Sequence, residues 1–190
     1  MSKVAIVGDA SGTGTFTISA PNGNTDRTLV LPDEAGTVLT SAGVPASAMP
    51  AGSVIQVVYT LDAAVTSDQV TSSTTFIDVD GMSVTITPRF STSKLLVFAR
   101  FMSYVSGGAS PYMLTTIARD GVNTSSSTYS FGYTQGDIYV AQPLNLTTIV
   151  SANNTNPTTF KAQMRLGGGG ATQCQTDKGD KLIYVMEIAA

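Results

Sequence analysis

The sequence lacks histidine and tryptophan and contains a single cysteine, Cys174. Without histidine, the chain has neither the commonest general base nor the commonest metal ligand. One cysteine cannot form an intrachain disulfide or a cysteine-based zinc site, and Cys174 has no histidine to activate it as a nucleophile. We therefore expect a protein that is not an enzyme and that holds no metal or other cofactor.

Charge is also scarce. Charged residues make up 12% of the chain, against roughly 25% in typical soluble domains. The net charge is -3 and there is no cluster of Lys or Arg, which argues against nucleic-acid binding. No apolar run approaches the roughly 20 residues of a membrane span, and the opening MSKVAIVGDA is too short in apolar residues for a signal peptide. We expect synthesis in a cytoplasm and no membrane insertion.

Gly, Ser, Thr and Asn take the place of the missing charges. With 42% hydrophobic residues the chain is too apolar for disorder. From residue 53 onward, nine or ten short apolar segments recur at the 8–12-residue spacing typical of an antiparallel β-sandwich. The sequence predicts an all-β, jelly-roll-like domain over residues 53–190. Residues 1–40 hold only three strands of four or five residues, too few to build a core alone. Residues 41–52 read as a linker.

The longest apolar run, KLLVFARFMSYV at residues 94–105, predicts a strand that is apolar on both faces. Side chains alternate between the faces of a strand. We expect the Leu95, Val97 and Phe101 face to fill the sandwich core. The opposite face, Leu96, Phe98 and Met102, is expected to pack on the flank of the second sheet or on neighbouring subunits. Residues 181–188, KLIYVMEI, predict a second strand of this two-sided kind.

Turn residues mark several further features. Asp80-Gly81 and Asp120-Gly121 predict hairpin turns. Asp78 and Asp80 also match the start of a calcium loop, but the later ligands are missing, which favours the turn. Pro143 is expected at a bulge or bend of a long strand. Residues 66–75 form a polar Ser/Thr segment.

Several tyrosines lie at or beside expected loops. Tyrosine combines an apolar ring with a hydroxyl, which suits contacts with sugars or proteins. Half-buried packing in the sandwich is the competing interpretation. For a receptor contact we single out Tyr129, Tyr133 and Tyr112.

Two stretches resemble bacteriophage fibre proteins. The core TLVLPDEAGTVL, residues 28–39, is similar to a module that recurs in those fibres. The remainder resembles the C-terminal β-domain of many phage fibres, in residues 51–58, 93–97, 159–165 and 183–188. The resemblance implies a homotrimer in the virion, attached through residues 1–40 to other tail or capsid proteins. It also implies that the C-terminal domain meets a glycan or protein on the host surface.

Two alternatives remain open. One is a capsid decoration or head-fibre protein with a stabilising or weakly adhesive role. The other is a depolymerase that cleaves surface polysaccharide. The carboxylates are scattered and none of them pair by sequence, so nothing selects the two that such an enzyme needs.

Overall fold

The computed structural model describes residues 11–15, 17, 22–24, 26, 28, 49–62, 68–107, 111–124, 128–131, 142–168, 170–176 and 180–190. The chain divides into two compact units, Met1–Val38 and Leu39–Ala190. In the first unit, residues 22–24 form bends, where Asn22 and Gly23 favour a turn. The short strands expected in residues 1–40 lie outside the described residues or coincide with isolated ones that are not in a strand.

The second unit is built from strands, and no helix occurs among the residues described above. Accordingly, the described part of the chain contains no helix long and apolar enough to cross a membrane. The strands are β1 (Val54–Asp62), β2 (Gln69–Thr71), β3 (Ile77–Ile86), β4 (Lys94–Gly107), β5 (Tyr112–Arg119), β6 (Val122–Asn123), β7 (Thr128–Phe131), β8 (Gln142–Ser151), β9 (Thr158–Gly168), β10 (Ala171–Thr176) and β11 (Lys181–Ile188).

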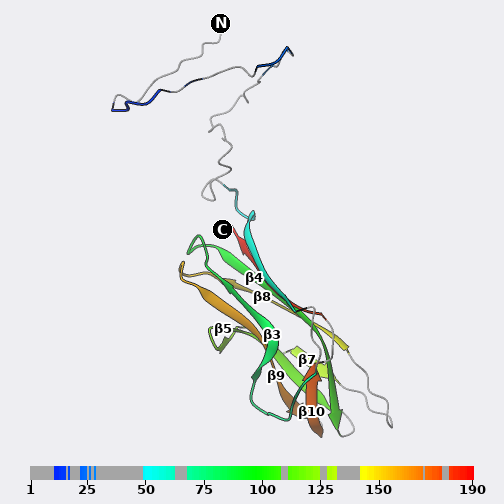
Figure 1. Ribbon diagram of the computed structural model, residues 1–190. Coiled ribbons are helices and arrows are strands. Elements are labelled where there is room, and N and C mark those ends of the chain that lie inside the picture. Colours follow the sequence, from blue (N-terminus) through cyan, green and yellow to red (C-terminus); the bar gives the residue numbers. More distant parts are fainter. Residues whose placement is uncertain are drawn as a thin grey trace. The chain divides into compact units, whose positions relative to one another are not determined.

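These strands form two antiparallel sheets. In sheet A, β4 pairs with β8 on one edge and with β10 and β11 on the other, and β1 and β2 complete the sheet. In sheet B the order is β3-β9-β5, with β6 and β7 on the free edge of β5. The all-β sandwich expected from the sequence is therefore confirmed. Figure 1 shows the long strands running the length of the domain.

The register simplifies the topology to four strand positions in each sheet. β10 and β11 pair with successive parts of the same edge of β4. On their far side, β1 pairs with β11 and β2 pairs with β10. β6 and β7 likewise share one edge of β5. When β1 and β2, β6 and β7, and β10 and β11 are each counted as one position, the chain crosses between the sheets at every step except the β5–β6 hairpin. This is the path of a jelly roll.

The core lies between the sheets and is centred on β4. Leu95, Val97 and Phe101 point inward and are at most 1% exposed, as the alternation of the sequence predicts. They meet Phe160 and Met164 of β9 in one apolar cluster. β4 and β11, the two strands with apolar residues on both faces, are direct neighbours, paired from Lys94–Ile188 to Arg100–Leu182. The two-sided strands thus form the middle of sheet A.

One of the two expected hairpins exists. Asp120 and Gly121, with φ of 49° and 84°, join β5 to β6. The hairpin expected at Asp80-Gly81 is wrong: β3 runs through these residues as one strand. Its register against β9 jumps between Asp78 and Ser83, so the positive φ of Gly81 serves a bulge.

Two smaller expectations also change. Pro143 lies in regular register opposite Met102 and makes no bulge. β8 is an edge strand that, among the described strands, pairs only with β4. Proline is tolerated in such a strand, because the N–H that it lacks would face solvent and not a neighbouring strand. The polar segment at residues 66–75 contains a strand, β2, which pairs with β10. At three residues it is too short to stand out by periodicity.

Side chains close the flank of the sandwich where β1 and β2 meet β3. Gln56 and Thr60 point from β1 toward sheet B and donate to the carbonyls of Thr87 (2.8 Å) and Ser83 (2.7 Å). Gln69 of β2 donates to the Asp78 carbonyl and accepts from the Asp80 amide. These bonds occupy groups on the outer edge of β3, which would otherwise be open to pairing with another chain.

At the end where the chain enters and leaves the sandwich, a buried carboxylate holds the β3–β4 connection. The backbone amides of Arg89 and Phe90 donate to Glu187 at 2.8 to 3.1 Å, and Gln56 Nε2 donates at 2.6 Å. Burial acts to raise the pKa of Glu187, but these hydrogen bonds outweigh it and hold the pKa below its ordinary value.

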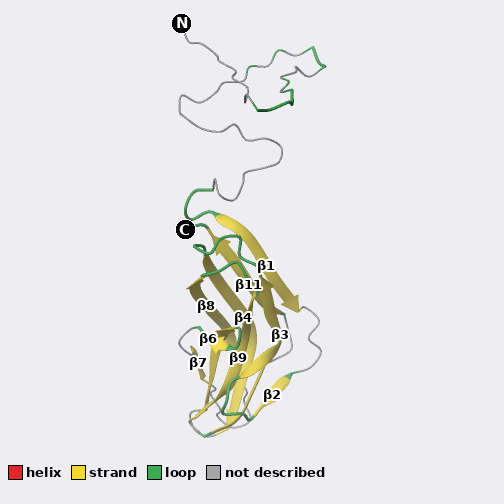
Figure 2. Cartoon of the chain, turned by 90° about the vertical axis from the view of Figure 1, so that its left-hand side faces the viewer, coloured by secondary structure: helices red, strands yellow, loops and turns green. Residues whose placement is uncertain are grey.

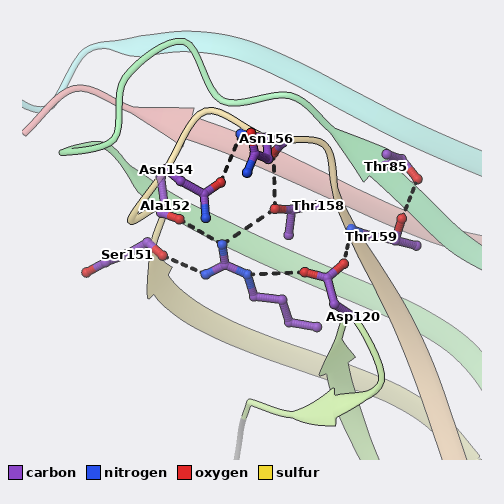
Figure 3. A network of polar contacts seen from close by, with 9 residues as sticks. Thr85, Asp120, Ser151, Ala152, Asn154, Asn156, Thr158 and Thr159 are labelled. Carbon is purple, nitrogen blue, oxygen red and sulfur yellow. Dashed lines mark hydrogen bonds and ion pairs between the residues drawn. The ribbon is translucent and has the colours of Figure 1, made fainter.

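An arginine fixes the β8–β9 connection at the same end (Figure 3). The Arg119 guanidinium donates to the carbonyls of Ser151 and Ala152, both at 2.7 Å. Asp120 accepts from the Thr159 amide at 2.9 Å. The connection therefore has a defined conformation although it contains no regular structure.

Candidate interaction surface

The outer face of sheet A is the most unusual surface of the sandwich. Strand alternation places one side chain in two on this face, away from sheet B. Most of these residues are apolar: Val57, Tyr59 and Leu61 of β1, Val70 of β2, Leu182, Tyr184, Met186 and Ile188 of β11, Leu96, Phe98, Met102 and Tyr104 of β4, and Pro143 and Ile149 of β8. We call this set the apolar face.

The strand register arranges the apolar face in rows. Val57, Met186, Leu96 and Ile149 lie side by side across four strands. The next row holds Tyr59, Tyr184, Phe98 and Thr147. In its centre the rings of Phe98 and Tyr184 stack, with centroids 5.1 Å apart and planes 24° from parallel.

Exposure rises toward the edges of the face. The central residues Phe98 and Tyr184 are half-buried, whereas Tyr59 is 66% exposed and Ile149 60% exposed. Exposed apolar groups in one continuous patch are uncommon on a monomer and indicate an interaction surface. Four strand positions and the 14 residues of β4 give a face on the order of 700 Å². That is close to the roughly 800 Å² that each partner buries in a standard interface.

The outer face of sheet B is polar, in contrast. Lys161 Nζ lies 2.6 Å from Asp78 Oδ2, and Gln163 donates to Asp78 Oδ1 at 2.7 Å. The hydrogen bond from Gln163, followed by that from Lys161, lowers the pKa of Asp78 below its ordinary value against a small opposing effect of burial. Asp78 is thus engaged by side chains. The two outer faces differ in character, so the apolar face is a local feature and does not reflect the composition of the whole chain.

The structure brings the expected interface residues together. Leu96, Phe98 and Met102 lie in the centre of the apolar face, half-buried, and point away from sheet B. They therefore do not pack on the second sheet. Sequence reasoning missed the contribution of β1. Val57, Tyr59 and Leu61 recur at every second position of β1, and this apolar alternation in the sequence was the available signal.

The tyrosines expected at a receptor contact are placed only in part. Tyr112 begins β5 at the end of the sandwich opposite Ser53, where the chain enters. Its ring lies on the backbone of Gly167 and Gly168, so closely that a methyl group on Gly167 would collide with it. Tyr129 lies on β7, paired with Leu114 of β5. Tyr133 lies outside the described residues.

The described residues contain no group of three or more His, Cys, Asp or Glu that could hold a metal ion. Cys174 points into the core opposite Val105 and is fully buried. Burial raises the pKa of its thiol to about 11. The thiolate, which is the reactive form, is therefore scarce at neutral pH.

Comparison with known proteins identifies no family. No family model matches the chain, and no curated protein matches it in sequence. Among solved structures, the Eiger TNF of S. frugiperda matches 72% of this chain and 94% of its own, with 8% identity and a TM-score of 0.42. The dimeric latent PorU of Porphyromonas gingivalis matches 74% of this chain but 14% of its own, with 10% identity and a TM-score of 0.33. At these values neither likeness bears on function.

Proposed function

We propose that the protein is a non-enzymatic structural component of a bacteriophage particle, a short fibre. In this proposal residues 1–40 attach the fibre to tail or capsid proteins, and the sandwich forms a homotrimer that contacts the host surface. The proposal rests on the resemblance of residues 28–39 to phage fibre modules and on the apolar face.

The apolar face is the observation that carries the proposal. A face on the order of 700 Å² that stays exposed to water lowers the solubility of the protein. Burying its apolar surface is favourable by roughly 25 cal/mol for each Å² removed from water. Contact with other copies of the chain buries Phe98, Tyr184 and the exposed residues of β1 at once. A fibre needs such permanent contacts, because its subunits must stay together outside a cell.

The positions of the two ends of the sandwich suit the same proposal. The chain enters at Ser53, whose carbonyl accepts from the amide of Ala189 at 2.9 Å, so both termini of the sandwich lie at one end. Tyr112 lies at the opposite end. If residues 1–40 are held by the particle, the Tyr112 end is the one that can reach a glycan or protein on the host.

Particle incorporation tests the proposal. The chain carrying a C-terminal epitope tag is labelled and located on particles by electron microscopy. Label on tail fibres or on the capsid supports the virion role, and the position separates a tail fibre from a capsid decoration protein. Absence of label from purified particles would overturn the proposal. Cleavage of surface polysaccharide by the purified protein would instead favour the depolymerase.

Deletion of residues 1–40 tests the attachment. The truncated chain is expected to lose its place on particles while the sandwich stays folded, which circular dichroism can check. A truncated chain that still decorates particles would show that attachment lies elsewhere in the chain.

A further inference from the structure

One arginine lies on the outer side of sheet A among the residues of the apolar face, and the described residues leave it without a partner. Arg100 lies on β4 in the row formed with Leu61, Leu182 and Asn145. Its side chain is exposed and makes no hydrogen bond or ion pair with any residue the structure describes. Lys94, the other cation on this face, donates to Ser151 Oγ at 2.8 Å. A guanidinium enclosed in an apolar contact without a carboxylate would be strongly unfavourable.

Carboxylates without a basic partner gather elsewhere on the sandwich. Within the described residues of this domain, four aspartates make no ion pair and lie where β1, β2 and the start of β11 approach β3: Asp62, Asp68, Asp80 and Asp180. We call this region the acidic flank. Figure 2 shows β1, β2 and β3 together on one flank of the domain, and β6, β7 and β8 on the opposite flank.

Asp80 is an exposed member of the acidic flank whose backbone is held in place. It lies on the bulge of β3, and its residue is exposed. Its backbone amide donates to Gln69 and its carbonyl accepts from buried Lys181, at 2.8 and 3.3 Å, while its carboxylate has no hydrogen bond to a described residue. The backbone of Asp80 is therefore fixed, and the side chain is free to meet a cation.

We propose that copies of the chain associate face to edge, with the apolar face of one copy against the acidic flank of the next and Arg100 paired with Asp80. The inference rests on the proposed association through the apolar face, and it specifies which surface of the second copy covers that face. The occupant of the face is a second copy, because the charges complement each other and one chain carries both surfaces: the face on the outer side of sheet A and the flank along its β1 and β2 edge.

The alternative is a two-fold contact in which the apolar face meets itself. A two-fold axis through the middle of the face would bring Arg100 toward the Arg100 of its partner, with like charges opposed in an apolar contact. A face-to-edge contact avoids this. Because it joins two different surfaces, each copy still offers one of each. Such a contact closes as a ring when its rotation brings the last copy back to the first, and it otherwise extends as a filament. A ring of three is the trimer proposed above.

A charge swap in the full-length chain tests the pairing. We compare wild type, Arg100→Asp, Asp80→Arg and the double variant by light scattering over a range of concentrations. Each single variant is expected to weaken association by roughly tenfold or more, because it places like charges together. The double variant is expected to recover most of the loss. Lys94→Asp combined with Asp80→Arg is the matched control, and it is expected to give no recovery.

Cross-linking gives a readout that does not depend on affinity. The variants Arg100→Cys, Asp80→Cys and the two combined are each treated with a short bismaleimide. Cys174 is buried and serves as its own background control in the wild type. On a denaturing gel, the variant with both cysteines is expected to run as covalent trimers. Each variant with one introduced cysteine is expected to run as monomers.

The outcomes separate the two proposals. A monomeric wild type would overturn both the association and the face-to-edge contact. Two results would overturn the face-to-edge contact only: an associated wild type whose charge-swapped double variant does not recover, or efficient covalent dimers from Arg100→Cys alone. Recovery with covalent trimers supports it.

Discussion

Phe98 and Tyr184 stack on the solvent side of the two central strands of sheet A, with ring centroids 5.1 Å apart. The pair lies in the same row as Tyr59, which is 66% exposed. Three aromatic rings lie across adjacent strands on the side away from the core, and such aromatic clusters are typical of interfaces.

Phe98→Asp is therefore expected to weaken association by roughly tenfold or more while the sandwich stays folded, since central aromatic residues dominate interface energies. Light scattering measures the first effect and circular dichroism the second. Asn123→Asp, on the exposed strand β6 and on the flank opposite β1, β2 and β3, is the matched control and should change neither. Failure of Phe98→Asp to fold would place Phe98 in the core and contradict the interface assignment.

The alternation of residues 94–105 was sufficient to predict which face of β4 is core and which is not, because the period of a strand is fixed by its geometry. The pairing partner of that strand could not be predicted from the sequence. β4 and β11 meet across some 90 residues of chain, and the pattern of each strand is compatible with many partners. The row from Tyr59 to Phe98 follows from that register and so could not be predicted.

The two Asp-Gly pairs show the same limit in turns. Glycine supplies a positive φ equally well for a hairpin at Gly121 and for a bulge at Gly81. What distinguishes them is the partner: β9 continues past the bulge on the same edge of β3. Likewise, the partners of Glu187 are mainly backbone amides, which no sequence pattern marks.

Glu187→Gln tests the buried carboxylate. The pKa of Glu187 is lowered in the folded state. Its stabilising effect is therefore full above the unfolded value of about 4.3 and is lost as the pH falls through the lower folded value. At pH 7 the variant is expected to be less stable by about 2 kcal/mol. The difference should narrow as the pH falls below about 4.

Urea denaturation of both proteins from pH 7 to pH 3 measures this difference. The pKa of Asp78 is also lowered, so both proteins share a second source of acid sensitivity. The difference in stability between wild type and variant cancels this shared effect. A stability difference that stays constant over the whole range would contradict the assignment of the carboxylate as the charged acceptor of the Arg89 and Phe90 amides.

Gly167→Ala tests the packing of Tyr112. A Cβ at position 167 would collide with the Tyr112 ring, so the variant is expected to lose about 1 to 3 kcal/mol of stability, as in other overpacked sites. Adding Tyr112→Ala removes the ring, and the same glycine change should then cost much less. Chemical denaturation of the four proteins in the cycle measures the coupling. Equal costs in both backgrounds would show that the ring does not rest on the glycine.

Arg119→Lys tests the clamp on the β8–β9 connection. A lysine lacks the planar fork by which Nη1 and Nη2 of Arg119 each reach one carbonyl, so the variant is expected to lose about 1.5 to 3 kcal/mol. Hydrogen exchange should become faster at the Ala152 and Thr159 amides, whose bonds to Ser93 and Asp120 anchor the connection. Exchange in β4 and β11 should change little. Uniform acceleration across the sandwich would indicate a global effect instead of a local clamp.

The central claim is that the apolar face is buried between copies of the chain, and the mass of the purified full-length protein in solution tests it most directly. Light scattering at micromolar concentration is expected to give about three times the 19.6 kDa of one chain. A stable mass of 19.6 kDa at that concentration would contradict the claim, because the apolar face would then be exposed to solvent.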